Sequence, residues 1–170
     1  MHFTQKSAQK ETVMETRRPA LTTEQYIEII TAMKESGCNS YPNDSVITAI
    51  VLDGIFGLRI SELTSLRLCD FASDGGTCHL AITEKKTGKQ RTLAVQPVLL
   101  RYVENYCLRN RIERNEKMFP IPPGIIRKQL AITCERLGYS GISMHSFRRW
   151  HIDNCRNDGF DSPLIQMIAP

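Results

Sequence analysis

Three clusters of cations in this sequence combine residue types that can bind a phosphate group. The first is GLRISEL at residues 57–63, where Arg59 follows a long apolar stretch that ordinary packing would continue with an aliphatic residue. A guanidinium at such a position has to be paired or has to face a bound anion. Glu62, three residues later, can tether it. The alternative is an ordinary Arg–Glu surface pair at the junction of two helices.

The second cluster is KKTGKQR at residues 85–91, which holds Lys85, Lys86, Lys89 and Arg91. Its polar, glycine-bearing segment joins two stretches with strand-like alternation, which predicts a β-hairpin with a basic tip. Four cations on a protruding ribbon suit contacts with the backbone of a nucleic acid. The alternative is a solvated turn whose lysines keep the strand edge soluble.

The third cluster is SMHSFRRW at residues 143–150. His145 and Arg148 are three residues apart, so a helix that begins here presents both on one face. The N-terminus of a helix adds free N–H groups and a positive dipole end, which favour an anion, and Arg149 adds a further cation. The alternative is that His145 caps the helix while both arginines pair with surface carboxylates.

Two helices are expected ahead of the first cluster. Thr22 and Gln25 form a capping-box pattern, and the helix that follows carries an apolar stripe and should end near Gly37. The stripe consists of Tyr26, Ile29, Ile30 and Met33. The next helix, SVITAIVLDGIFG at residues 45–57, is apolar on nearly every side, which indicates a helix in the middle of a domain. A short helix should follow, capped by Ser61 or the residue before it.

The rest of the chain predicts one β-hairpin and four more helices. Strands are expected at residues 77–82 and 91–95, and helices at about 97–108, 124–138, 145–156 and 163–169. Trp150 is expected to anchor the core. Residues 1–18 have the polar composition of a flexible tail. The predicted fold is therefore mainly α with a small antiparallel β-hairpin or sheet, in the α+β class.

Composition sets limits on the function. With 170 residues, 41% hydrophobic and 24% charged, the chain suits one globular domain, and its net charge of +4 permits a polyanionic partner. The sequence has neither a bilayer-spanning run nor a signal peptide, so a cytoplasmic location is expected. The six cysteines form no CxxC pair, which indicates reduced thiols. His151 and Cys155 lack further ligands, so no metal site is expected.

The three clusters, in this order and spacing, resemble the tyrosine recombinases and phage integrases. The resemblance includes GLRISEL followed by Asp70, then KTGKQR, then HSFR, and extends through residues 158–168 after that box. It covers the chain from roughly Leu21 to its end. It implies the fold of a recombinase catalytic domain over residues 19–170, and it implies double-stranded DNA as the partner, bound by a homo-oligomer of two to four subunits.

The resemblance also implies a role for each site residue. Arg59 and Arg148 are the two catalytic arginines, Lys86 is the hairpin lysine, His145 is the histidine of the H-x-x-R box, and Glu62 supports Arg59. These cations would stabilise the five-coordinate phosphorus formed when a phosphodiester is exchanged for a phosphotyrosine, without a metal or other cofactor. Further DNA contacts are expected from Lys85, Lys89, Arg91 and Arg149.

One departure from the family pattern bears on activity. The family's nucleophilic tyrosine follows the H-x-x-R box, whereas all five tyrosines of this chain precede it. The expectation is a catalytic domain of a mobile-element recombinase or integrase that lacks its tyrosine-bearing segment, without room for a core-binding domain, and inactive on its own. Two alternatives remain: a catalytically inactive DNA-binding remnant or regulator, and a helical interaction protein with coincidental motifs.

Overall fold

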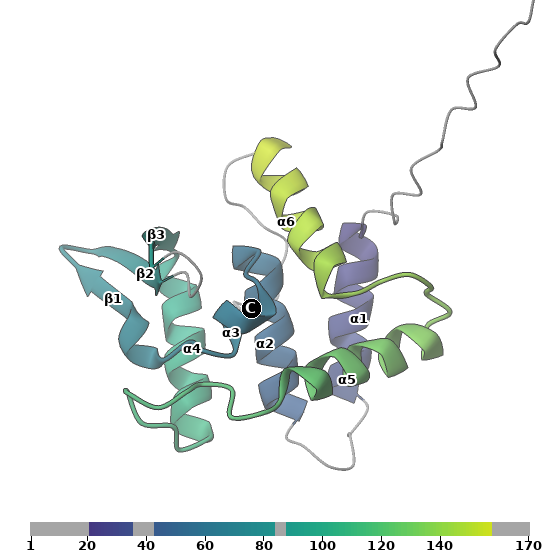
Figure 1. Ribbon diagram of the computed structural model, residues 1–170, viewed down its shortest axis with the longest axis horizontal. Helices are drawn as coiled ribbons and strands as arrows, with labels where there is room; N and C mark the ends of the chain where they lie inside the picture. The colour runs from purple at the N-terminus through teal and green to yellow at the C-terminus, as the bar shows by residue number, and fades with distance from the viewer. Residues whose placement is uncertain (1–20, 36–42, 84–87, 158–170) are drawn as a thin grey trace, which may run out of the picture.

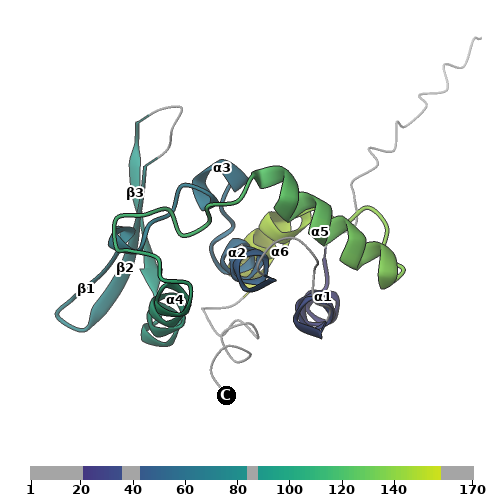
Figure 2. The same cartoon turned by 90° about the horizontal axis from the view of Figure 1, so that it is seen from below.

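The computed structural model describes residues 21–35, 43–83 and 88–157, and for residues 43 and 155–157 it describes the backbone alone. The elements are α1 (Thr23–Glu35), α2 (Asn43–Phe56), α3 (Ile60–Leu63), a 3-10 turn η1 (Leu68–Asp70), β1 (Phe71–Asp74), β2 (Thr77–Thr83), β3 (Gln90–Val95), α4 (Pro97–Arg109), α5 (Pro123–Arg136) and α6 (Met144–Asn157). The sheet and α4 lie at one end, α1, α5 and α6 at the other, and α2 and α3 between them (Figures 1 and 2).

Helix α2 is the centre of the domain, as its apolar sequence predicts. Ala49, Ile50 and Leu52 are fully buried although they point to different sides of the helix. Helices α1, α3, α5 and α6 all contact it. A helix surrounded in this way has no solvent face, which explains why its hydrophobic residues show almost no one-sided pattern.

Aromatic side chains fasten α1 and α6 to this central helix. The predicted capping box of α1 is present, since Thr22 and Gln25 exchange hydrogen bonds between backbone N–H and side chain at 3.0 and 3.2 Å. The buried Tyr26 donates its hydroxyl hydrogen to the Ile50 carbonyl oxygen at 2.9 Å. Trp150 of α6 stacks on the Tyr26 ring at 4.8 Å and is 4% exposed, so the prediction of a core anchor is confirmed.

The small sheet has the strand order β1-β2-β3, with both pairs antiparallel. The predicted hairpin is confirmed, and each strand extends one residue closer to the loop, where Thr83 lies opposite Gln90. Strand β1 was not predicted, because it has four residues and only Phe71 among them is buried. Lys85 and Lys86, expected at the tip, lie outside the described residues.

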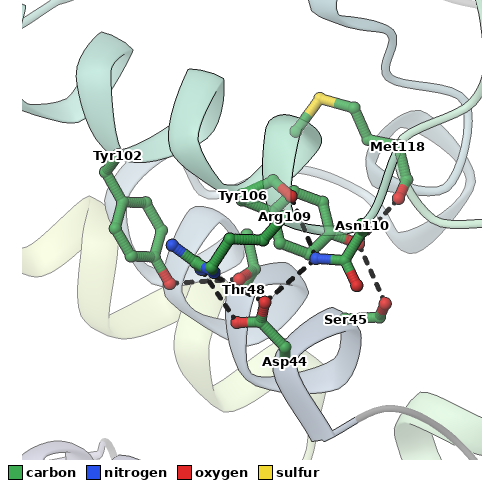
Figure 3. Close-up of polar contacts among 8 residues, drawn as sticks. All are labelled: Asp44, Ser45, Thr48, Tyr102, Tyr106, Arg109, Asn110 and Met118. Atoms are coloured by element: carbon green, nitrogen blue, oxygen red, sulfur yellow. Dashed lines mark hydrogen bonds and ion pairs between the residues drawn. The ribbon is translucent and has the colours of Figure 1, made fainter. Parts of the chain in front are cut away.

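Polar contacts attach α4 to the first half of α2 (Figure 3). The hydroxyls of Tyr102 and Thr48 lie 3.1 Å apart. The Tyr106 hydroxyl lies 2.9 Å from the Ser45 hydroxyl and donates to the Met118 carbonyl oxygen at 2.8 Å. At the start of α2 the network is completed by Asp44, Arg109 and Asn110. These bonds hold α4, and the sheet that precedes it, at a fixed position along α2.

The observed helix boundaries differ from the predicted ones at one functionally relevant place. Helix α3 begins at Ile60 and its N-cap is Arg59, one or two residues earlier than expected. The reason is that the Glu62 carboxylate accepts the Arg59 backbone N–H at 2.8 Å, which extends the helical turn backwards.

The predicted tail at residues 1–18 and helix at 163–169 fall outside the described residues. Within the described ranges no helix is long and apolar enough to cross a membrane.

Replacement of Gly54 in α2 by alanine should destabilise the fold. A Cβ atom there would lie 2.3 Å from the Tyr26 hydroxyl oxygen, and Tyr26 is locked between α2 and Trp150. Overpacking of this kind costs about 1–3 kcal/mol, which urea denaturation followed by circular dichroism would measure. Gly124→Ala is the matched control, because nothing lies within 4 Å of its Cβ position in α5. Equal midpoints for both variants would contradict the packing described here.

Candidate phosphate-binding site

A buried carboxylate joins the first cluster to the hairpin. The Glu62 side chain is 3% exposed, and its Oε2 accepts hydrogen bonds from the Arg59 backbone N–H at 2.8 Å and from Arg91 Nη2 at 2.9 Å. Its Oε1 faces Arg59 Nη1 at 3.4 Å. The predicted tether between Glu62 and Arg59 is therefore present. Because a buried charge is tolerated only when it is paired and hydrogen-bonded, these three donors explain how Glu62 stays inside.

The third cluster reaches the same junction through α6. Arg148 Nη1 donates to the Gly57 carbonyl oxygen at 2.8 Å, although the two residues are 91 positions apart in the sequence. Gly57 has a φ of +57°, and a Cβ atom there would lie 2.5 Å from His151 Cδ2. Glycine is thus required both by the left-handed backbone and by the close approach of α6. The contact places Arg148 against the backbone two residues before Arg59.

His151, which the sequence indicates only as part of an incomplete set of metal ligands, also lies in this region. It follows Arg148 by three residues and so lies on the same face of α6, half-buried against Gly57. Burial lowers the pKa of His151, and the neighbouring charges of Arg148 and Arg91 lower it further, while hydrogen bonds to the backbone of Gly54 and Ile55 act against them. The imidazole ring of His151 thus packs against the backbone at the end of α2.

Asp53 is a further acidic residue near this junction, and unlike Glu62 it was not among the residues predicted from the sequence. It is 1% exposed in α2, and in the described part of the chain neither carboxylate oxygen has a hydrogen-bond partner. Burial raises the pKa of Asp53 to about 8, and the positive charge of Arg148 acts in the opposite direction. The sequence does contain an indication that Asp53 is unusual, because it is the one acidic residue within an otherwise apolar helical run after Ser45.

The remaining predicted site residues are exposed or lie outside the described residues. His145 is exposed in the first turn of α6, one turn before Arg148, and Arg149 is also exposed. Lys89 is exposed immediately before β3. Lys85 and Lys86 are outside the described residues, so their positions relative to the arginines stay predictions. The structure therefore joins Arg59, Glu62 and Arg91 in one cluster, and it places Arg148 on the Gly57 carbonyl oxygen, two residues before Arg59 in the sequence.

The tyrosine hydroxyls in the described residues all have hydrogen-bond partners, and none of these partners is Arg59 or Arg148. Burial raises the pKa of Tyr26 and of Tyr102, and raises that of Tyr106 to about 12. Tyr139 donates to the Glu28 carboxylate, and this bond raises its pKa. Neutral hydroxyls held in this way are poor nucleophiles. Tyr41 lies outside the described residues.

The cysteines in the described part of the chain are free thiols, and three of them are buried. Burial raises the pKa of Cys107 and of Cys134 to about 11, so both stay protonated and unreactive at neutral pH. Within the same residues no group of three or more histidine, cysteine or acidic side chains is arranged to hold a metal ion.

A family profile matches nearly the whole of this chain. The sequence profile of the phage integrase family matches residues 19–169. No curated protein matches the sequence.

Several solved recombinase structures share the fold. XerH site-specific recombinase bound to its difH substrate superposes with a TM-score of 0.67 at 15% identity, over 88% of this chain and 46% of that one. A lambda integrase dimer bound to a COC′ core site gives 0.62 at 19% identity, over 91% and 45% of the two chains. The integrase of mycobacterium phage Brujita gives 0.60 at 16% identity, over 91% and 50%. The chain spans about half the length of these proteins, and the predicted mainly α fold with a small antiparallel sheet is confirmed.

Asp53 should make the stability of the fold depend on pH. Its pKa is about 8 in the folded state against an ordinary value of 3.8, so the unfolded chain releases this proton first and the free energy of unfolding falls as pH rises from about 4 to 8. Asp53→Asn removes this loss. We expect the variant to exceed the parent by a few kcal/mol at pH 9, at about 1.4 kcal/mol per pKa unit, with the difference narrowing toward pH 4.

The measurement is urea denaturation of both proteins at pH 5, 7 and 9. Asp74→Asn serves as the control, because Asp74 is exposed at the end of β1 and its substitution should shift all three values equally. Parallel pH profiles for Asp53→Asn and the parent would show that Asp53 does not titrate in this range.

Proposed function

Because this chain belongs to the phage integrase family, we propose that it is the catalytic domain of a site-specific DNA recombinase in which Arg59 and Arg148 grip the scissile phosphate. The observation that carries the proposal is the hydrogen bond from Arg148 to the Gly57 carbonyl oxygen. It brings a guanidinium from α6 to the backbone that leads directly into Arg59. This contact supports the proposal that two cations from distant parts of the sequence face a single phosphate at this junction.

Two guanidinium groups suit the proposed reaction. When a nucleophile adds to a phosphodiester, negative charge builds up on the two non-bridging oxygens, and a planar guanidinium can donate two parallel hydrogen bonds to such oxygens. The Glu62 carboxylate and the Gly57 carbonyl oxygen hold the two arginines before substrate arrives. Groups positioned in advance stabilise developing charge without reorganising, which is the main way such sites accelerate reactions.

The proton transfers are assigned to the other two predicted residues. Lys86 would protonate the departing 5′-oxygen, since a lysine ammonium on the hairpin carries the required proton. His145, exposed one turn before Arg148, would exchange a proton with the reacting groups near neutral pH. Lys85, Lys89 and Arg149 would contact the DNA backbone on either side of the scissile phosphate.

The proposed partner is double-stranded DNA, bound by two to four copies of this chain. The XerH structure is a complex with its difH substrate, and the lambda integrase structure is a dimer on a core site. The net charge of +4 agrees with a DNA partner, though it does not require one. The DNA sequence recognised depends on groove contacts that the site itself does not contain.

A second candidate function is occupation of a DNA site without cleavage, as a remnant or a regulator. The observation in its favour is that the tyrosine hydroxyls of the described residues are hydrogen-bonded to Ile50, Thr48, Ser45 or Glu28 and away from the two arginines. Such a protein would retain the phosphate-binding arginines and lack the nucleophile.

Arg148→Ala should weaken DNA binding and reduce its dependence on salt. Loss of a charge-assisted bond to phosphate costs about 1.5–3 kcal/mol, which raises the Kd roughly tenfold or more. The slope of log affinity against log salt should decrease by about one. Fluorescence anisotropy with labelled duplexes at several salt concentrations measures both quantities.

Arg101→Ala is the matched control, because Arg101 is an exposed cation on α4 and lies outside the cluster. It should leave the affinity and the salt slope nearly unchanged. Arg148→Lys keeps the charge without the planar donor pair and should recover only part of the affinity. Binding by the parent protein that is indifferent to salt would refute the DNA-binding function.

The 170-residue chain should form no covalent bond to DNA. A nicked suicide duplex traps a phosphotyrosine, and denaturing electrophoresis would reveal the adduct as a shifted band. None is expected, because no tyrosine follows Arg148 and the described hydroxyls are engaged elsewhere. An adduct would show that one of the five tyrosines is the nucleophile and would refute the non-cleaving candidate, and substitution of each tyrosine by phenylalanine would identify it.

A further inference from the structure

We propose that Arg91 is a positioning residue for Arg59 that acts through Glu62, and that it does not contact the DNA backbone. The inference rests on the proposed function, and it revises the role that the basic sequence around the hairpin tip suggests for Arg91. It also assigns β3 a part in the phosphate-binding site. The geometry of three side chains carries it.

The first step is the direction in which Arg91 points. Along β3 the exposed residues are Gln90, Thr92 and Ala94, whereas Arg91 alternates with them and shares a face with Leu93 and Val95. Arg91 also lies directly opposite Ile82, which is 4% exposed. Because successive strand residues point to opposite faces, Arg91 belongs to the face of the sheet that packs on the domain.

The second step is how Arg91 is held. Its side chain is 33% exposed, against 58% for that of Arg59. Its Nη2 donates to Glu62 Oε2 at 2.9 Å, and its Nε is buried without a hydrogen-bond partner among the described residues. The guanidinium is therefore turned toward the protein and bonded there. Binding a phosphate instead would require this group to break its contact with a buried carboxylate, which is costly.

The third step is the division of the Glu62 carboxylate between two arginines. Its Oε2 is fixed by the Arg59 backbone N–H and by Arg91. Its Oε1 is left to the Arg59 guanidinium at 3.4 Å. Arg91 thus sets the plane of the carboxylate, and that plane sets the direction of Arg59.

The charges of the three side chains lead to the same conclusion. Two guanidinium groups and one carboxylate carry a net charge of +1, and the shorter of the two ion pairs, at 2.9 Å against 3.4 Å, involves Arg91. Arg91 compensates the buried negative charge, so the more exposed Arg59 keeps its positive charge for an anion. Without Arg91 the uncompensated carboxylate would draw Arg59 inward.

The test is a double-mutant cycle in DNA binding across a series of salt concentrations. The proteins are the parent, Arg91→Met, Arg59→Met and the double variant, with Lys89→Met as a control at an exposed cation immediately before β3. If Arg91 acts through Arg59, Arg91→Met raises the Kd roughly threefold to tenfold and lowers the salt slope no further than Arg59→Met does. In the Arg59→Met background it should have no further effect. Lys89→Met, which removes a predicted phosphate contact, should lower the slope by about 0.9.

Two results would overturn the proposal. A further decrease of about one in the salt slope when Arg91→Met is added to Arg59→Met would show that Arg91 contacts phosphate itself. Equal losses in the parent and Arg59→Met backgrounds would show that it acts independently of Arg59, either directly or by general destabilisation. All variants are compared well below their melting temperatures.

A conservative variant keeps the test decisive if Arg91→Met does not fold. Arg91→Lys retains the charge and one donor, so it should restore part of the affinity and follow the same non-additive pattern with Arg59→Met. Additive losses for the lysine variant would overturn the inference equally. Absence of salt-dependent DNA binding by the parent protein is a different outcome, since it refutes the proposed function itself.

Discussion

The contact between the end of α2 and α6 at Gly57 is the constraint on which the site depends. Two residues of α6, one turn apart, dock on the last turn of α2: Arg148 on the Gly57 carbonyl oxygen and His151 where a Gly57 side chain would lie. The positive φ of Gly57 then turns the chain into Arg59 and α3. Because α2 is held on all sides by the core, this turn has a fixed position. The backbone at Gly57 therefore fixes both the start of the segment that carries Arg59 and the carbonyl oxygen that Arg148 binds.

Two buried carboxylates near this junction illustrate opposite solutions to the same electrostatic problem. The Glu62 carboxylate is hydrogen-bonded to two guanidinium groups and a backbone N–H. Asp53 has no such partners in the described residues, and its raised pKa means that it is mostly protonated near neutral pH. The first arrangement holds a carboxylate in place beside two cations, and the second avoids a fixed charge that would compete for Arg148 with the proposed phosphate.

Local patterns predicted the local structure, and long-range packing decided the rest. The capping box at Thr22, the apolar α2 and the hairpin followed from spacing and composition alone. Strand β1 did not, because a four-residue strand with one buried side chain has almost no pattern. The roles of Asp53 and His151 depend on contacts between segments about a hundred residues apart, which composition does not encode. Arg91 is the instructive case: its basic neighbours suggested a DNA contact, whereas strand alternation with Leu93 and Val95 already placed it on the inner face.

The stacking of Trp150 on Tyr26 has a practical consequence. The chain contains a single tryptophan, and it lies two residues after Arg148 on the same helix, almost wholly shielded from water. The emission of an indole ring depends on the polarity around it, so any displacement of α6 when the protein engages a ligand would register in its intrinsic fluorescence. Trp150 can therefore serve as an intrinsic fluorescent probe beside the proposed phosphate site, and no label has to be introduced to follow binding there.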